Sequence, residues 1–216
     1  MNFKRTVGIA IALAATLSVP GAHAGILRNV LSSVGLSKPD AAKPAADGVQ
    51  SFPRLGYTCC DLHYSKDWIN DYNFAELPII PAGTPVEVIK YGHYRAFLKI
   101  EGKPMRLGQD YGRDQETLDK YVKKIIVSDD PRPRISSYPV SVQEAIRQGK
   151  VTVGMTREQV IVSLGHPMPS ENVSLDAPAW RYWRASGAQY NVYFGADGHV
   201  MKVTGDEPVV EQMLLK

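Results

Sequence analysis

The sequence of 216 residues has only two cysteines, and they are neighbours, Cys59 and Cys60. Adjacent cysteines cannot join two distant segments, so a fold held together by disulfides between separate elements is excluded. Three interpretations of the pair stay open: a structural or unpaired role, a vicinal disulfide, or a redox or metal site that includes Asp61 and His63. The spacing matches no zinc pattern with two separated cysteine pairs.

The chain also lacks a strong charge imbalance and, beyond its start, a long apolar run. It carries 25 basic and 22 acidic residues, and the loss of Lys4 and Arg5 with a leader would leave 23 basic residues. The basic residues are scattered, so we expect no nucleic-acid partner. After residue 24 nothing approaches the roughly 20 apolar residues that cross a bilayer, which predicts a soluble or peripherally membrane-associated product.

Catalytic motifs are absent as well. The sequence contains no nucleophile elbow, no HExxH helix, no phosphate-binding glycine loop and no paired cysteine ligands. His63 follows Cys60 by three residues, but no third group is identifiable that would orient this pair as base and nucleophile. We therefore expect no catalytic residue, no bound metal, no cofactor and no small-molecule ligand.

The first 24 residues have the parts of a cleavable secretory signal in the required order. Lys4 and Arg5 precede an apolar run at 7–19, and small residues end the segment. This pattern predicts cleavage between Ala24 and Gly25, and hence a periplasmic protein. The alternative, a retained membrane anchor, requires a longer apolar run.

A mostly flexible tether is expected at 25–54. Apolar residues recur at helical spacing from Ile26 to Val34, and a stretch rich in alanine, proline and lysine follows. The alternative interpretation of the first part is a helix that lies on a membrane surface.

The segment 55–128 reads as a β-rich, small barrel-like domain that ends in a helix. Strands are expected at 86–90, 94–100 and 105–107, because β-branched and aromatic residues alternate there between glycine-containing turns. They predict a small antiparallel barrel or curled meander. A helix over 118–126 has one apolar face, which we expect to cover the open face of the strands.

A linker is expected at 129–139, where Pro131 and Pro133 prevent the helix from continuing. A second domain, 140–205, begins with two predicted helices. Each has a candidate capping box, formed by Ser141 with Glu144 in the first and by Thr156 with Gln159 in the second. Gly149 and Gly165 fit the left-handed position after each helix, and the proline at 167 prevents the second from resuming.

Three strands complete the second domain, at 179–184, 190–194 and 199–203. The predicted class is therefore α+β, with a helix pair on one face of a three-stranded antiparallel sheet. We expect Trp180 in the core and Trp183 exposed or at an interface, which makes the opposite face of the sheet a candidate binding surface. The tail, 206–216, has apolar residues at helical spacing that dock on this domain or on another protein.

A chain of short motifs in this domain is similar to a known family. The motif residues are Gly154, Met155, Thr156, Gln159, Val160, Leu164, Gly165, Pro167, Trp180, Tyr182, Phe194, Asp197, Gly198 and Val200. Over 151–203 the sequence resembles the SmpA/OmlA (BamE-like) family. The middle of the chain has a looser likeness to small bacterial src-homology type barrels.

The resemblance implies a non-catalytic binding or assembly module of the bacterial cell envelope, associated with the outer membrane, whose partner is another envelope protein. Two alternatives of other classes remain. One is a thiol-dependent redox or metal-binding protein that uses Cys59 and Cys60. The other is a cell-wall glycan or peptide binder that uses the barrel-like domain.

Overall fold

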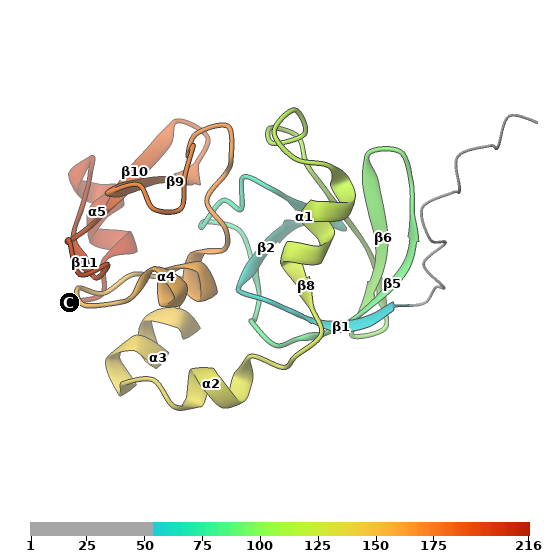
Figure 1. Ribbon diagram of the computed structural model, residues 1–216, viewed down its shortest axis with the longest axis horizontal. Coiled ribbons are helices and arrows are strands. Elements are labelled where there is room, and N and C mark those ends of the chain that lie inside the picture. The colour runs from blue at the N-terminus through green and yellow to red at the C-terminus, as the bar shows by residue number, and fades with distance from the viewer. Residues whose placement is uncertain (1–53) are drawn as a thin grey trace, which may run out of the picture. The chain divides into compact units, whose positions relative to one another are not determined.

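The computed structural model describes residues 54–216, which belong to one compact unit. The predicted signal at 1–24, its cleavage site between Ala24 and Gly25, and nearly all of the tether lie outside the described residues. The described chain is α+β: a curled eight-stranded sheet, a separate three-stranded antiparallel sheet and five helices (Figure 1).

The curled sheet contains the three predicted strands at its middle. Its strands are β1 (Arg54–Thr58), β2 (Leu62–Ser65), β3 (Trp68–Asn70), β4 (Ile79–Ile80), β5 (Pro85–Tyr91), β6 (Arg95–Ile100), β7 (Lys103–Gly108) and β8 (Ile126–Val127), in the order β4-β2-β3-β7-β6-β5-β1-β8. The hairpins β5–β6 and β6–β7 are antiparallel, whereas β3 pairs in parallel with β7. The five strands that the sequence did not predict have two to five residues each.

The helix α1 (Leu118–Ile125) covers the open side of the curled sheet, as predicted (Figure 1). Its buried side chains join the core of the sheet and are Tyr121, Val122 and Ile125. The prediction that Ile126 continues the helix is wrong. Ile126 still donates to the carbonyl of Val122, but its backbone is extended and it pairs with Thr58 in β8.

The predicted linker at 129–139 contains a short helix, α2 (Arg132–Ser136). Pro131 stands at its N-cap and Pro133 in its first turn. A proline there removes an N–H that has no partner within a helix, so both residues permit α2 to begin. α1 has already ended at Ile125, where the chain enters β8.

The next two helices are α3 (Val140–Arg147) and α4 (Arg157–Leu164), and only one capping box is confirmed. Thr156 accepts from the backbone of Gln159, whose side chain accepts from the Thr156 backbone at 2.9 Å. The box predicted at Ser141 is wrong, because the N-cap of α3 is Pro139, two residues earlier. Ser141 therefore lies inside the first turn, and the Glu144 carboxylate pairs with the end of α3 instead.

Both predicted glycine stops have positive φ, but they differ. Gly149 has φ 61° and follows the C-cap of α3, as expected. Gly165 is itself the C-cap of α4, with φ 78° and ψ 176°, a region that is essentially restricted to glycine and is not left-handed helical. A Cβ at 165 would also come within 2.6 Å of the Asn73 side-chain nitrogen.

The second sheet consists of β9 (Ala179–Ala185), β10 (Ala188–Phe194) and β11 (Val200–Gly205), in the order β11-β10-β9. Its inner face buries aromatic and branched side chains with α3 and α4, and the largest are Trp180, Tyr182, Tyr190, Val192 and Phe194. Trp180 is fully buried, as predicted. The tail forms α5 (Glu207–Met213), which docks on its own region because Val209 and Met213 enter this core.

Candidate binding surface

The face of the second sheet that points away from its helices is polar and aromatic. Three of its side chains lie in one row across the strands, since Asn191 pairs with Arg181 on one side and with Thr204 on the other. In the next row Lys202 stands beside Tyr193, with its ammonium 5.0 Å from the ring centre. These side chains are exposed or half-exposed, so the face is open to a partner.

Trp183 lies at the edge of this face and is half-buried, because it also lines a hollow of about 340 Å³. The residues around this aromatic hollow are Tyr72, Phe74, Tyr111, Met168, Glu171, Trp183, Ser186 and Gly187. The Tyr72 ring stacks on Phe74 with centres 4.0 Å apart and meets Tyr111 edge-on at 5.8 Å. The first three residues come from the curled-sheet region, so the hollow forms where the two regions meet.

Backbone hydrogen bonds fix the loop that carries Tyr72 and Phe74 against β9. Ala75 donates to the carbonyl of Trp183 at 3.3 Å, and Glu76 donates to the carbonyl of Arg184 at 3.0 Å. These bonds continue along the open edge of β9 and place the aromatic pair beside the Trp183 ring.

A buried carboxylate fixes the loop that contributes Tyr111 to the hollow. The Asp71 carboxylate accepts from the backbone N–H groups of Asp110, Tyr111 and Gly112, so it fixes the loop that presents the Tyr111 ring. Burial raises the pKa of Asp71, and the three N–H donors oppose this rise. Because the donors are backbone groups, replacing the side chains at 110–112 would leave these hydrogen bonds in place. Removal of the Asp71 carboxyl would break all three.

The chemistry of the hollow suits binding. Its walls are aromatic and thioether surface, which is adaptable and apolar, and a few polar groups lie among them. Glu171 is paired with Arg181 at 2.9 Å. The Trp183 indole nitrogen is buried and has no hydrogen-bond partner among residues 54–216, which leaves one donor of the lining residues unsatisfied.

The C-terminus of α4 is where the two regions are joined. The last carbonyls of a helix have no partner within it. Here Asp61 donates its backbone N–H to Val162 at 2.9 Å, and the Asn73 side chain donates to Leu164 at 2.8 Å. Asn73 also accepts from the backbone of His63 at 2.7 Å. The sequence indicated a glycine stop here and gave no sign that the curled-sheet region supplies the caps.

The cysteine pair lies in the turn between β1 and β2. Cys59 and Cys60 are joined by a disulfide, with Cys60 fully buried and Cys59 half-buried. The His63 ring places Nδ1 2.8 Å from the Leu77 carbonyl, and burial lowers its pKa. The sulfurs are thus bonded to each other and the imidazole to a backbone group. No group of three or more His, Cys, Asp or Glu residues within 54–216 is placed to hold a metal ion.

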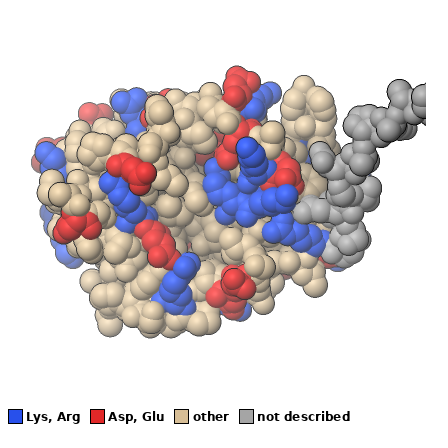
Figure 2. All heavy atoms as spheres, viewed as in Figure 1, with Lys and Arg blue, Asp and Glu red and all other residues tan. Residues whose placement is uncertain are grey.

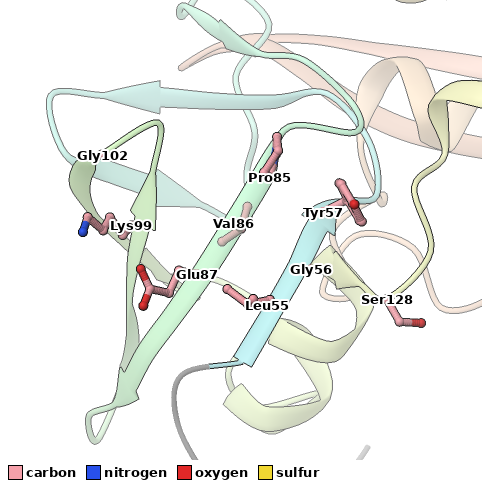
Figure 3. A pocket seen from close by; sticks show the side chains of 9 residues that line it. All are labelled: Leu55, Gly56, Tyr57, Pro85, Val86, Glu87, Lys99, Gly102 and Ser128. Carbon is pink, nitrogen blue, oxygen red and sulfur yellow. The ribbon is translucent and has the colours of Figure 1, made fainter.

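Another hollow, of about 560 Å³, lies elsewhere (Figure 3). It spans β1, β5 and β6, and its charged groups are Glu87 and Lys99, which are directly opposite each other in the sheet. Its polar side chains are half-buried or exposed, and Leu55 is 74% exposed. No buried polar group of the described chain converges on it, so this hollow lacks the placed polar groups that are typical of a ligand site.

The residues that carry the resemblance lie in the core and in turns. Met155, Val160, Leu164, Trp180, Tyr182, Phe194 and Val200 are buried, Gly154 and Gly198 have positive φ, Pro167 is buried and Asp197 accepts from the His199 backbone. They hold the second sheet on its helices. The residues that sequence reasoning missed, Tyr72, Phe74 and Tyr111, come from loops of the other region, and only their aromatic character marks them.

Two further properties bear on partners. Figure 2 shows basic and acidic side chains interspersed over one face of the molecule. Within 54–216, none of the helices combines the length and the apolar character needed to span a membrane. Comparison with known proteins finds no family model, no curated protein and no solved structure that matches this chain.

Proposed function

We propose that this chain is an exported, non-catalytic binding or assembly module of the bacterial cell envelope. It acts in the periplasm, in peripheral association with the outer membrane, and its partner is another envelope protein. The outer face of the second sheet and the aromatic hollow form the contact surface, and Trp183 belongs to both.

The arrangement of the second region supports the proposed SmpA/OmlA-like identity. Two helices are followed by a three-stranded antiparallel sheet in the order that the resemblance implies, with Trp180 and Phe194 on the same buried face. A helix pair on one side of a sheet leaves the other side available for docking, and aromatic side chains at its edge are typical of contact surfaces.

The observation that carries the proposal is the half-buried Trp183 with an unpartnered indole N–H, set in an apolar hollow between two regions. Tryptophan and tyrosine are enriched among the residues that dominate binding energies. A partner side chain that fills this hollow would cover aromatic surface and could accept from the indole at the same time.

Site-specific photocrosslinking in intact cells tests the proposal. A photoreactive residue in place of Ser186, which is exposed and lines the hollow, is expected to capture one envelope protein reproducibly. Trp183→Ala in the same chain should reduce that crosslink at least tenfold, since truncation of an aromatic hot-spot residue weakens binding by about 2 kcal/mol or more.

A matched position on another face is the control. Val140 is 81% exposed at the start of α3, so a photoreactive residue there should not give the same product. Equal capture from both positions, or no envelope protein from Ser186 in a folded and exported chain, would remove the proposed surface.

The cysteine pair supports a second candidate function, a thiol-dependent redox protein. The half-exposed Cys59 gives a reductant access to the disulfide with Cys60. Joint replacement of both cysteines by serine separates the two ideas: retained crosslinking from Ser186 favours the binding module, whereas its loss in a folded chain favours thiol chemistry.

A further inference from the structure

A second cavity, of about 360 Å³, lies between the curled sheet and the helices α2 and α3. Its lining is Asp61, Ile79, Pro81, Ala82, Arg132, Ile135, Ser136, Gln143, Ile146 and Arg147. None of these residues lines the aromatic hollow, so the two sites are separate. We refer to this cavity as the Asp61 groove.

Asp61 differs from the other lining residues because it is only 2% exposed and one of its two carboxyl oxygens has no hydrogen-bond partner among the described residues. Oδ1 accepts from the backbone of Ala82 at 2.8 Å, whereas Oδ2 is buried without a hydrogen bond to any of residues 54–216. A buried polar atom left unpaired destabilises the folded chain, because it has lost its hydrogen bonds to water without replacement. Because Asp61 lines the cavity, a ligand bound there that reaches Oδ2 would supply the missing donor.

The other charged groups of the Asp61 groove already have partners. Arg132 is paired with Asp130 at 2.6 Å, and Arg147 is paired with Glu144. His63, two residues beyond Asp61, is buried with a lowered pKa and is therefore neutral at pH 7. Because both arginines of the lining are ion-paired, an ionised Asp61 would be the one charge of the groove lining that lacks a counterpart.

The walls define the rest of the ligand. Three isoleucines, Ile79, Ile135 and Ile146, contribute apolar surface to the lining. A ligand that fits must combine an apolar stem with a hydrogen-bond donor, and a positive donor complements the ionised form of the acid. A guanidinium recognises a carboxylate best through two oxygens, and Ala82 occupies one of them. A compact ammonium needs only Oδ2.

We propose that the Asp61 groove binds a primary alkyl ammonium group, with the nitrogen on Oδ2 of Asp61 and the methylene stem along the isoleucine walls. A lysine side chain of another protein and a free alkyl amine share this chemistry. The inference does not rest on the proposed binding surface around Trp183.

Binding releases a proton. Burial raises the pKa of Asp61 to about 8, against the effect of the Ala82 N–H donor, so the free protein carries the neutral acid at pH 7. On binding, the O–H bond breaks, the proton leaves to solvent, and the carboxylate accepts from the ammonium, whose own charge is unchanged. Affinity should therefore rise about tenfold for each pH unit from pH 6 toward 8 and level off above it.

Isothermal titration calorimetry of the chain from Gly25 onward tests the proposal with three probes at pH 6–9. We expect n-pentylamine and Nα-acetyl-lysine N-methylamide to bind, and pentanol to bind at least tenfold more weakly. Titrations in buffers of different ionisation enthalpy should report about one proton released per ammonium bound at pH 7. The stronger of the two amines identifies a free amine or a lysine side chain as the natural source.

Asp61→Asn is the matched variant, because the amide oxygen can still accept from Ala82 while the negative charge is removed. It should lose at least tenfold in amine affinity and lose the pH dependence, with an unchanged circular dichroism spectrum. Asp119→Asn, which removes an exposed carboxylate on α1, should bind as the unmodified chain does. Equal binding of pentanol and pentylamine, or an unaltered affinity in Asp61→Asn, would overturn the proposal, as would no binding of either amine at millimolar concentration.

Discussion

The two regions of the described chain obtain their order in different ways. In residues 140–213 the helices begin and end at local signals such as the Thr156 capping box and the glycine at 149, and neighbouring strands follow each other in sequence. In residues 54–127 short strands pair with distant ones, for example Tyr57 with Val127. Local patterns therefore predict the second region well, and only long-range contacts complete the first.

The regions also depend on each other where they meet. The end of α4 receives its hydrogen-bond donors from Asp61 and Asn73 of the first region, and the aromatic hollow takes its rings from both. Substitutions at this junction should destabilise both regions, whereas a substitution in a local capping signal should destabilise only the helix that it caps. Four predictions test this difference, from the largest expected effect to the smallest.

Gly165→Ala should lower the free energy of unfolding by roughly 3 kcal/mol, because the backbone at 165 is in a glycine-only region and the new Cβ would approach Asn73 at 2.6 Å. Gly198→Ala is the control. It has the same φ of 78° with open space around it and should cost only about 1 kcal/mol. Urea unfolding measures both, and equal losses would show that the junction adds nothing to the backbone strain.

Asn73→Ala should lower the free energy of unfolding by roughly 2 kcal/mol, since the backbone of His63 and the Leu164 carbonyl both lose a partner. Asn73→Asp retains the acceptor for His63 but sets a carboxylate oxygen against the Leu164 carbonyl, so it should lose at least as much. The expected loss should appear in both regions by hydrogen exchange. Faster exchange confined to residues 54–127 would argue that the regions are independent.

Asp61→Asn should raise stability at high pH. The pKa of Asp61 is raised to about 8 in the folded chain, so the folded state binds more protons than the unfolded state between pH 4 and 8, and stability falls as pH rises through that window. The variant lacks this loss and should exceed the unmodified chain at pH 8 by at least about 1.4 kcal/mol, the equivalent of one pKa unit. The gain should vanish near pH 4. Thermal unfolding across this range provides the measurement, and a pH-independent difference would contradict the account.

Thr156→Ala should cost about 1 kcal/mol, because both hydrogen bonds of the α4 capping box depend on its hydroxyl and its extended backbone. Ser141→Ala should change stability by less than about 0.5 kcal/mol, since Ser141 is exposed within the first turn of α3. Guanidinium unfolding of both variants compares a capping box that the structure contains with one that only the sequence pattern predicted. Similar losses at both positions would show that α3 is capped by Ser141 after all.

The sequence was sufficient for elements whose cause is local. The apolar faces of α1 and α3, the β5–β6–β7 hairpins and the burial of Trp180 all follow from periodicity and turn residues. The short strands β2, β3 and β4 could not be predicted, because two to four residues carry too little pattern. β2 and β3 form a local hairpin, but β3 also pairs with the distant β7, which local patterns do not reveal.

Only part of the candidate site could be predicted from the sequence. Trp183 was singled out because it alternates with the buried Trp180 and Tyr182 along one strand. Tyr72, Phe74 and Tyr111 lie in loops, and their position depends on the Asp71 carboxylate and on the edge of β9. Contacts of that kind are set by tertiary packing, which a single sequence does not reveal.

Hydrogen exchange of the chain from Gly25 onward, with and without the envelope protein captured through Ser186, tests the central claim most directly. The account predicts slower exchange on binding at 183–187, 72–74 and 111–112, the segments around the aromatic hollow, and no change at 54–57 and 85–87, which line the hollow of Figure 3. Protection at 54–57 and 85–87 alone would contradict it and move the binding surface to the curled sheet.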